Sequence, residues 1–268
     1  MKKIEVLEEA ARRVYDNVKH LPGTKESAGD FGRGAGGDIS RRIDILAEKA
    51  VLDYLKEIKF SCTVLGEECG RVEIADSPEG FLIMDAVDGS TNAVRGIPFS
   101  CCSLAFASGD RLSSVTDAVV IDLYNGDLYS ASKGNGAFLN GKKITVHKEK
   151  PLYFVVGLDL SGISADALQK LSPIISASNH IRHFGAVALE LAIFSRGLVD
   201  LFVDLREKLR ITDVAAGYLL VSEAGGFIVD RNSQPLDAEL GYDKRISFIA
   251  AANREILDET VEKLSLKD

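Results

Sequence analysis

An apolar run that ends directly in two carboxylates most constrains what this chain can fold into. Residues 81–84 read Phe-Leu-Ile-Met, a pattern typical of a buried strand. The chain continues as Asp85-Ala86-Val87-Asp88-Gly89-Ser90-Thr91. If a helix begins after Asp88, its unpaired N–H groups face the same point as the acids, which suits Mg²⁺ and phosphate together. The junction therefore predicts phosphoryl chemistry, and an ordinary Asp-Gly turn after a strand is the alternative.

Two other acidic segments support the same chemistry. Residues 62–68 form a short β-rich run that ends in a glycine and the paired acids Glu67 and Glu68. Residues 209–226 place Asp213 at the start of a small-residue helix closed by two glycines. Small residues at 215–217 would let that helix pack closely on a neighbour and hold Asp213 rigidly. The alternatives are solvated charges at 67–68 and an N-cap role for Asp213, which does not exclude metal binding.

Together these segments resemble the signature of the inositol monophosphatase and fructose-1,6-bisphosphatase superfamily of Mg²⁺-dependent, Li⁺-sensitive phosphatases. The family pattern is Gly-Glu-Glu, then Asp-Pro-(apolar)-Asp-Gly-(Thr/Ser)-Thr, then Asp-x-Ala-(Ala/Gly)-Gly. Here it falls on residues 66–68, 85–91 and 213–217, in the family's order and close to its spacing. The resemblance covers nearly the whole chain. It implies an α/β fold (α+β layered) of alternating helix and sheet layers, with the active site between the two halves.

Departures from the family pattern bear on the substrate. Ala86 stands where the family usually has Pro, and Thr212 stands where animal inositol phosphatases have Trp. Arg206 lies seven residues before Asp213, where inositol-specific members carry a Glu that binds inositol hydroxyls. The segment 204–210 is instead similar to the archaeal dual-activity fructose bisphosphatase/inositol monophosphatase branch. A cationic segment beside the site suits a substrate with a second phosphate.

The resemblance also implies a ligand set and a mechanism. Roughly two or three Mg²⁺, for which Mn²⁺ can substitute, would be held by Glu67, Asp85, the Val87 carbonyl, Asp88 and Asp213. The substrate would be held by Asp88, Gly89, Ser90, Thr91, Arg182, Arg206 and Arg210, with the arginines meeting a distal phosphate. The catalytic set is Asp44, Ser90 and Glu67. Water activated by the metal would attack phosphorus in line, and Ser90 and Asp44 would accept its proton.

A glycine-rich loop at residues 29–38 precedes the second helix. It lacks the Lys-Ser/Thr of a nucleotide-binding P-loop, and its glycines favour a mobile lid. The resemblance implies a flexible segment that closes over a metal, with Asp38 in the mobile loop and Asp44 near the nucleophilic water. Without the resemblance, Asp44 is interpreted as an ordinary acid in the first turns of a helix.

Composition excludes several classes of protein. The chain has 268 residues, enough for one domain or two tightly apposed ones, and its net charge of −8 argues against a nucleic-acid partner. No apolar run approaches the ~20 residues that a membrane span needs. The N-terminus predicts an amphipathic helix rather than a targeting signal. Four cysteines without metal spacing or a disulfide framework indicate a cytoplasmic protein.

Apolar periodicity and turn residues predict the order of elements. Helices are expected over residues 4–19, 41–58, 164–171, 185–196 and 213–224, and at the C-terminus. Strands are expected over residues 60–66, 80–85, 100–108, 115–122, 126–131, 153–158, 180–183, 198–204, 226–230 and 246–252. Charge and a proline at 148–151 mark a boundary. It separates an N-terminal α+β half, residues 1–150, with most metal ligands from a C-terminal α/β half, residues 151–268, with Asp213 and substrate-binding residues.

These observations predict a fructose-1,6-bisphosphatase with inositol 1-phosphate as a second substrate. The alternatives are a plain inositol monophosphatase, a nucleotide 3′-phosphatase, and a catalytically silent regulatory homologue, against which the complete acid set argues. For Arg206 the alternative is a surface ion pair with Asp204 or Glu207. The expected partner is a small phosphorylated sugar or inositol, with no nucleic acid or membrane. The family suggests a homodimer.

Overall fold

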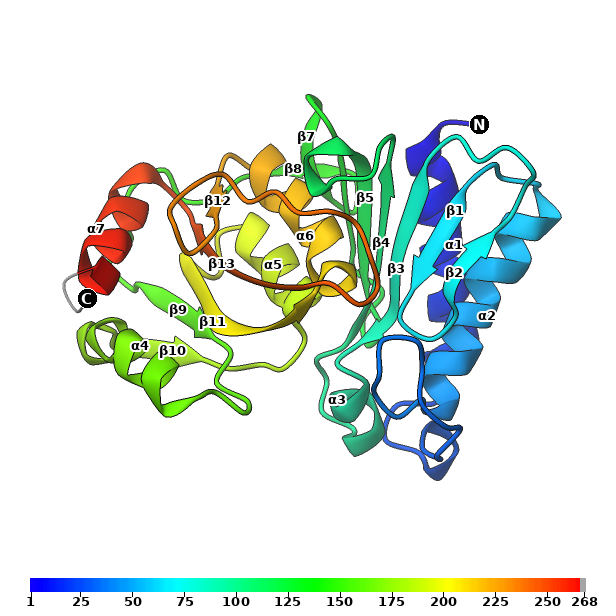
Figure 1. Ribbon diagram of the computed structural model, residues 1–268, viewed down its shortest axis with the longest axis horizontal. Helices are drawn as coiled ribbons and strands as arrows, with labels where there is room; N and C mark the ends of the chain where they lie inside the picture. Colours follow the sequence, from blue (N-terminus) through cyan, green and yellow to red (C-terminus); the bar gives the residue numbers. More distant parts are fainter. Residues whose placement is uncertain (266–268) are drawn as a thin grey trace.

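Helices and sheets alternate in layers across the computed structural model, which describes residues 1–265 (Figure 1). The helices are α1 (Lys3–Val18), α2 (Arg42–Glu57), α3 (Ser90–Arg95), α4 (Ala165–Ala177), α5 (Val187–Ser195), α6 (Ile211–Glu223) and α7 (Arg254–Ser265). The strands are β1 (Thr63–Gly66), β2 (Gly70–Glu73), β3 (Phe81–Asp88), β4 (Cys101–Ala107), β5 (Val115–Asp122), β6 (Leu128–Ser132), β7 (Gly136–Leu139), β8 (Lys142–Ile144), β9 (Val155–Leu158), β10 (His180–Arg182), β11 (Leu201–Arg210), β12 (Phe227–Val229) and β13 (Arg245–Ala251). The layered α/β class predicted above is confirmed.

The strands within residues 1–265 form two sheets. The first has eight strands in the order β2-β1-β3-β4-β5-β6-β7-β8. Strands β1 and β3 pair in parallel, whereas β1 pairs with β2, and β3 with β4, in antiparallel orientation. The second has five strands in the order β10-β9-β11-β13-β12. Its β10, β9 and β11 are parallel, so their carboxyl ends lie at one edge, where ligands of α/β proteins commonly bind.

The layers follow from which faces of the sheets are apolar. Helices α1 and α2 cover one face of the first sheet, α5 and α6 lie between the sheets, and α4 and α7 cover the outer face of the second (Figure 1). Strand β3 contributes Leu82 and Met84 to the core under α1 and α2, and Ile83 to the core between the sheets. Complete burial of such a side chain is worth roughly 1.5–3 kcal/mol. This alternation directs the next residue, Asp85, toward the α6 side.

Some elements differ in extent from the sequence-based expectation. Strand β3 continues beyond residue 85 to Asp88, and β11 continues beyond 204 to Arg210. Both extensions contain a shift of pairing register, so neither shows regular alternation in its sequence. Helix α4 continues through Pro173 to Ala177, where the burial of Ile174 maintains its apolar face. Strands β2, β7 and β8 lie outside the strand ranges given above, because three or four partly exposed residues carry little periodic signal.

The chain crosses from one sheet to the other around residues 145–154. Strand β8 ends the first sheet and β9 begins the second, on either side of the charged segment at 148–151. Helix α6, from the C-terminal part of the chain, nevertheless packs against strands of the first sheet. A division into two domains at residue 150 therefore stays a prediction. No helix within residues 1–265 combines the length and the apolarity needed to cross a membrane.

Candidate active site

A β-bulge near the end of β3 brings two acids to the same side of the sheet. Residues three apart on a regular strand point to opposite faces. Between Asp85 and Asp88 the pairing of β3 with β4 shifts, and Ala86 and Val87 both pack into the core under α1 and α2. The Val87 N–H donates to Asp85 Oδ1 at 3.0 Å, which orients that carboxylate. The extra residue thus lets both acids face the region of α6.

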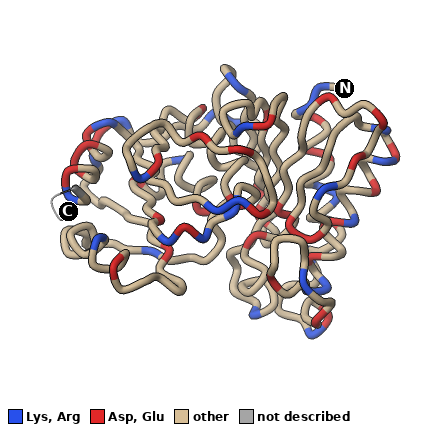
Figure 2. The backbone as a smooth tube through the Cα atoms, in the orientation of Figure 1, with Lys and Arg blue, Asp and Glu red and all other residues tan. Residues whose placement is uncertain are grey.

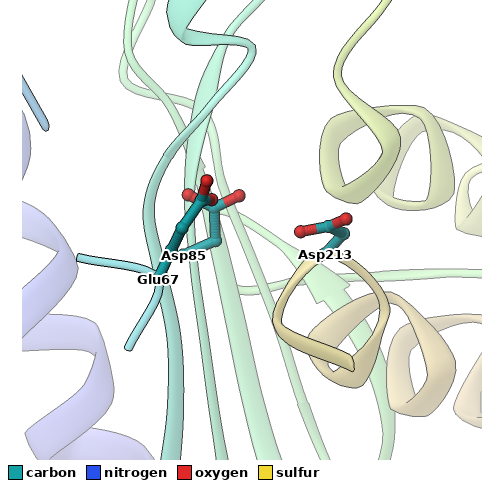
Figure 3. A group of neighbouring side chains, drawn as sticks. All are labelled: Glu67, Asp85 and Asp213. Atoms are coloured by element: carbon teal, nitrogen blue, oxygen red, sulfur yellow. The ribbon is translucent and has the colours of Figure 1, made fainter. Parts of the chain in front are cut away.

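Three carboxylates from three different elements converge there (Figure 3). Glu67 follows β1, Asp85 lies in β3, and Asp213 lies in the first turn of α6. Each offers one oxygen, and these oxygens all lie within 4.8 Å of one another. Figure 3 shows the carboxylate of Asp213 facing those of Glu67 and Asp85 across a gap. The structure therefore brings together three of the residues predicted to hold metal.

Burial and mutual repulsion make this cluster unfavourable in its ionised form. Burial raises the pKa of Glu67 to about 8, while the charge of Arg210 lowers it and that of Asp213 raises it. Burial also raises the pKa of Asp85 well above its usual range, and Glu67 adds to the rise. Two carboxylates ~4 Å apart repel by roughly 4 kcal/mol at an effective dielectric constant of ~20. The donor set fits a divalent cation, which prefers hard oxygen ligands and would relieve this repulsion.

Asp88 lies beside the three acids rather than among them. Its Oδ2 accepts a hydrogen bond from the Ala188 N–H in α5 at 2.6 Å. Burial, and then the charge of Asp213, raise the pKa of Asp88 to about 8. The next residue, Gly89, has φ of 81°, and a Cβ there would lie 2.8 Å from the Cβ of Ala186. Only glycine lets α3 begin this close to α5, and a metal-binding role for Asp88 and for the Val87 carbonyl stays a prediction.

The start of α2 supplies the second group of polar residues. Asp44 is the third residue of the helix, and its Oδ2 accepts from the Arg41 N–H at 2.8 Å. Its Oδ1 is buried and has no hydrogen-bond partner within the described residues. Burial raises the pKa of Asp44 to about 7. The guanidinium of Arg41 donates to Ser90 Oγ at 2.5 Å and to Thr91 Oγ1 at 3.1 Å.

The polar residues at the start of α2 and α3 line one cleft of about 420 Å³, together with two of the three clustered acids, Glu67 and Asp85. The cleft is lined by Arg33, Asp38, Ile39, Arg41, Asp44, Glu48, Glu67, Glu68, Asp85, Ala86, Val87, Ser90 and Thr91. Figure 2 shows acidic and basic residues gathered in the middle of the view, where the two sheets approach each other. The predicted proton acceptors Asp44 and Ser90 therefore share this cleft with three of the predicted metal ligands, Glu67, Asp85 and Val87.

The glycine-rich loop lies against the end of β1. The Gly36 N–H donates to the Glu67 carbonyl at 2.7 Å, and Arg245 donates to the Gly36 carbonyl at 3.0 Å. Arg210 pairs with Asp38 of this loop and lies 3.2 Å from Glu67 Oε1. A Cβ on Gly36 would lie 2.9 Å from Glu67 Cγ, so glycine permits this approach. Arg210 and Arg245, both from the C-terminal part of the chain, thus hold the loop against the acids.

The guanidinium of Arg206 is paired with carboxylates and is not free to bind a phosphate. Its Nη2 lies 2.5 Å from Asp204 Oδ2 and 2.6 Å from Asp159 Oδ2, and its side chain is 6 % exposed. This geometry favours the ion-pair alternative, with the correction that the pair is buried and that its second acid is Asp159. Glu207 instead pairs with Arg231. Arg182, at the end of β10, is exposed and donates to the Ile181 carbonyl.

Sequence reasoning missed polar residues at the carboxyl edge of the second sheet. Asp159 directly follows β9, and His183 directly follows the parallel strand β10. His183 Nε2 lies 3.0 Å from Asp159 Oδ1 and 3.2 Å from Ser161 Oγ. Their positions in the sequence could have identified them, because residues that directly follow parallel strands meet at one edge of the sheet. Together with Arg206 they form a polar network beside the acid cluster.

Comparisons with known proteins agree with this fold. The model of the inositol monophosphatase family matches residues 2–266. A Methanothermobacter thermautotrophicus protein named fructose-1,6-bisphosphatase/inositol-1-monophosphatase is 34 % identical, over 96 % of this chain and 94 % of that protein. A bifunctional NADP phosphatase/NAD kinase of Methanococcus maripaludis is 30 % identical, over 94 % of this chain and 47 % of that protein. A crystal structure described as an inositol monophosphatase–fructose 1,6-bisphosphatase matches with a TM-score of 0.86 at 28 % identity, covering 98 % of this chain and all of that one.

Proposed function

The chain belongs to the inositol monophosphatase family and is a phosphoric monoester hydrolase, and we propose that fructose 1,6-bisphosphate is its main substrate, with inositol 1-phosphate as a second. The observation that carries the proposal is the convergence of Glu67, Asp85 and Asp213 in a buried cluster. The substrate choice is supported by the names of several archaeal relatives at 30–34 % identity.

We propose Mg²⁺ as the metal, in roughly two or three copies, with Mn²⁺ as a substitute. The ions would be held by Glu67, Asp85, Asp213, Asp88 and the Val87 carbonyl. Family membership supports metal dependence, and the all-oxygen donor set supports a hard cation. When bound, these ions would supply an acidified water and stabilisation of the leaving alkoxide.

The chain's own residues would handle the proton and the phosphate. Asp44 Oδ1, buried and without a partner in the described residues, would accept the proton of the attacking water by way of the Ser90 hydroxyl. Its pKa of about 7 suits a general base near neutral pH. The backbone of residues 89–91 would hold the phosphate, and Asp88 would hold a substrate hydroxyl.

For the distal phosphate we propose Arg182. Arg206 and Arg210 were the other candidates, but each guanidinium is engaged by two carboxylates. Arg182 is exposed and lies at the carboxyl edge of the second sheet. Arg182→Gln should lower kcat/KM on fructose 1,6-bisphosphate by roughly ten- to a hundredfold, because a charge-assisted contact is typically worth ~1.5–3 kcal/mol. Inositol 1-phosphate has no second phosphate and serves as the control, and equal losses on both substrates would contradict this role.

A nucleotide phosphatase is the second candidate function. It is favoured by the likeness to the NADP phosphatase/NAD kinase, of which this chain spans about half the length. Mg²⁺-dependent phosphate release should be compared on fructose 1,6-bisphosphate, inositol 1-phosphate, NADP and a nucleoside 3′-phosphate, with EDTA as the control. We expect the highest kcat/KM on fructose 1,6-bisphosphate. A tenfold or greater preference for either nucleotide would overturn the first assignment.

We also propose that the enzyme is a cytoplasmic homodimer. The four cysteines, all within the described residues, are free, which suits a reducing compartment. The dimer rests on the family resemblance. Sedimentation equilibrium would measure the mass, and a monomer at assay concentrations would contradict the dimer.

A further inference from the structure

Arg41 stands out among the charged residues of the cleft by the kind of partner it has. Its two terminal nitrogens donate to the hydroxyls of Ser90 and Thr91, at 2.5 and 3.1 Å. Within residues 1–265 no ion pair joins its guanidinium to a carboxylate. A full positive charge thus lies inside an acidic cleft, bonded through its side chain to neutral oxygens.

The other arginines near the site are held differently. Arg206 and Arg210 each contact two carboxylates, so an anion could bind them only by displacing or sharing an ion pair. Arg33 also lines the cleft, but it is exposed and donates to the Gly37 carbonyl of its own loop. Arg41 is instead anchored, because its backbone N–H is bound by Asp44 at the start of α2. It combines a fixed backbone with a guanidinium that forms no ion pair with a carboxylate within the described residues.

We propose that Arg41 binds the phosphate group that is hydrolysed and at the same time orients the Ser90 hydroxyl. The proposal rests on the proposed function and adds a residue to it. A guanidinium presents five N–H donors in a planar fork, so one can stay on Ser90 while others reach phosphate oxygens. A phosphate is an ionised acceptor that Arg can bind through two parallel N–H···O bonds, whereas Thr91 Oγ1 is a neutral acceptor of one bond, so phosphate would be preferred over Thr91 Oγ1.

The same contact constrains the proton of Ser90. Because Ser90 Oγ accepts a hydrogen bond from Arg41, its own proton must point away from the guanidinium. The buried, unpartnered Oδ1 of Asp44 lines the same cleft and is an available acceptor. Arg41 would thereby leave one lone pair of Ser90 for the attacking water and direct its proton toward the acid.

The test uses inorganic phosphate as the probe and the full chain loaded with Mg²⁺. The variants are Arg41→Gln and Arg41→Lys, with Arg42→Gln as the matched control. Arg42 is the next residue, and its side chain is exposed and lies outside the cleft, so Arg42→Gln removes the same charge from the neighbouring position. Two readouts are needed: the inhibition constant of phosphate during turnover, and the rise in melting temperature that phosphate produces without substrate. The second does not depend on catalysis.

We expect Arg41→Gln to weaken phosphate binding by roughly ten- to a hundredfold in both readouts, and Arg42→Gln to leave it unchanged. Arg41→Lys should fall between them, because an ammonium lacks the planar fork. Should Arg41→Gln fail to fold, the same comparison is made with Arg41→Lys, for which at least a threefold loss is expected.

Two results would overturn the proposal. One is a lower kcat for Arg41→Gln with unchanged phosphate affinity, which would leave Arg41 as a support for the hydroxyls only. The other is an equal loss in Arg42→Gln, which would indicate a general field effect. A wild-type protein that hydrolyses none of the four phosphate esters would refute the proposed function instead, while the melting readout would still report on Arg41.

Discussion

The starts of α2 and α6 share a local plan and differ in their surroundings. Each helix is preceded by an arginine, Arg41 or Arg210, and carries an aspartate three residues later, Asp44 or Asp213. In both, the aspartate accepts the backbone N–H of the arginine at 2.8 Å. At α6 the arginine side chain pairs with acids, and the aspartate faces two further carboxylates. At α2 the arginine bonds to hydroxyls, and one oxygen of the aspartate has no partner in the described residues.

At both helix starts the local sequence pattern determines the backbone conformation and the orientation of the aspartate, but not its functional role. An acid at the third helical position satisfies a free N–H wherever it occurs. The role of the second carboxylate oxygen depends on which residues the fold places opposite it. Opposite α6 lie Glu67, which follows β1, and Asp85 of β3, so Asp213 joins a set of acids that could hold a cation. Opposite α2 lie the hydroxyls at the start of α3, so Asp44 is available for a proton.

The largest effect should come from Asp213→Asn. Turnover should fall by more than about a thousandfold, because a neutral amide cannot balance the charge of the metals on which the reaction depends. The rise in melting temperature with Mg²⁺ should also be lost or much reduced. Phosphate release and thermal melts measure both effects. A folded Asp213→Asn protein with near-normal activity would refute the assigned site.

Asp44→Asn should have a smaller effect of a different kind. We expect kcat to fall on the order of a hundredfold, which is typical of losing a general base. The Mg²⁺-dependent rise in melting temperature should remain, since Asp44 is not among the clustered acids. If both aspartate variants lost the metal response equally, the functional difference between the two helix starts would be wrong.

The pH dependence of stability should separate the two groups of acids. Burial raises the pKa of Asp44 and Glu48 to about 7 and that of Glu67 and Asp88 to about 8, above the values near 4 of the unfolded chain. The folded state therefore holds protons that the unfolded chain releases, so stability from these groups is full below about pH 4 and is lost as pH rises to about 8.

Mg²⁺ should cancel only part of this loss. With saturating metal, the pH dependence that belongs to Glu67 and Asp88 should disappear, and a residual fall in stability between about pH 4 and pH 7 should remain. Asp44→Asn should reduce that residual fall. Chemical denaturation across pH 4–9, with and without Mg²⁺, measures these differences. A metal-free protein whose stability rises from pH 5 to pH 8 would contradict the expected sign.

The smallest effect should come from Arg210→Gln. The variant removes the pair with Asp38 and the contact with Glu67, so the glycine-rich loop should be cleaved faster by proteases. The metal-free protein should lose about 1–2 kcal/mol of stability, because Glu67 keeps its acidic neighbours without the compensating charge. The matched comparison is Arg41→Gln, which should leave cleavage of the loop unchanged. Equal resistance of the loop to proteases in wild type and Arg210→Gln would argue against this role of Arg210.

The order of strands and helices in the sequence predicted the layered fold, and the resemblance to the family pattern predicted the convergence of the three acids. Glu67, Asp85 and Asp213 each follow an apolar strand or begin a small-residue helix, and such ends meet in layered folds. The register shift in β3 could not be predicted, since it depends on pairing with β4. The ion pair of Arg206 with Asp159 could not be predicted for a similar reason, because it depends on the packing of β9 beside β11.

The bulge in β3 makes the length of the chain part of the site. Between Asp85 and Asp88 the strand advances three residues while its partner advances two, from Ser103 to Cys101. If β3 kept the same residues but paired with β4 without the bulge, regular alternation would send Asp88 to the face opposite that of Asp85. Asp88 would then point into the apolar core under α1 and α2, with no amino acid exchanged at any ligand position. A relative with one residue fewer between the two acids would place both on the same face without a bulge, so the three-residue spacing and the bulge depend on each other.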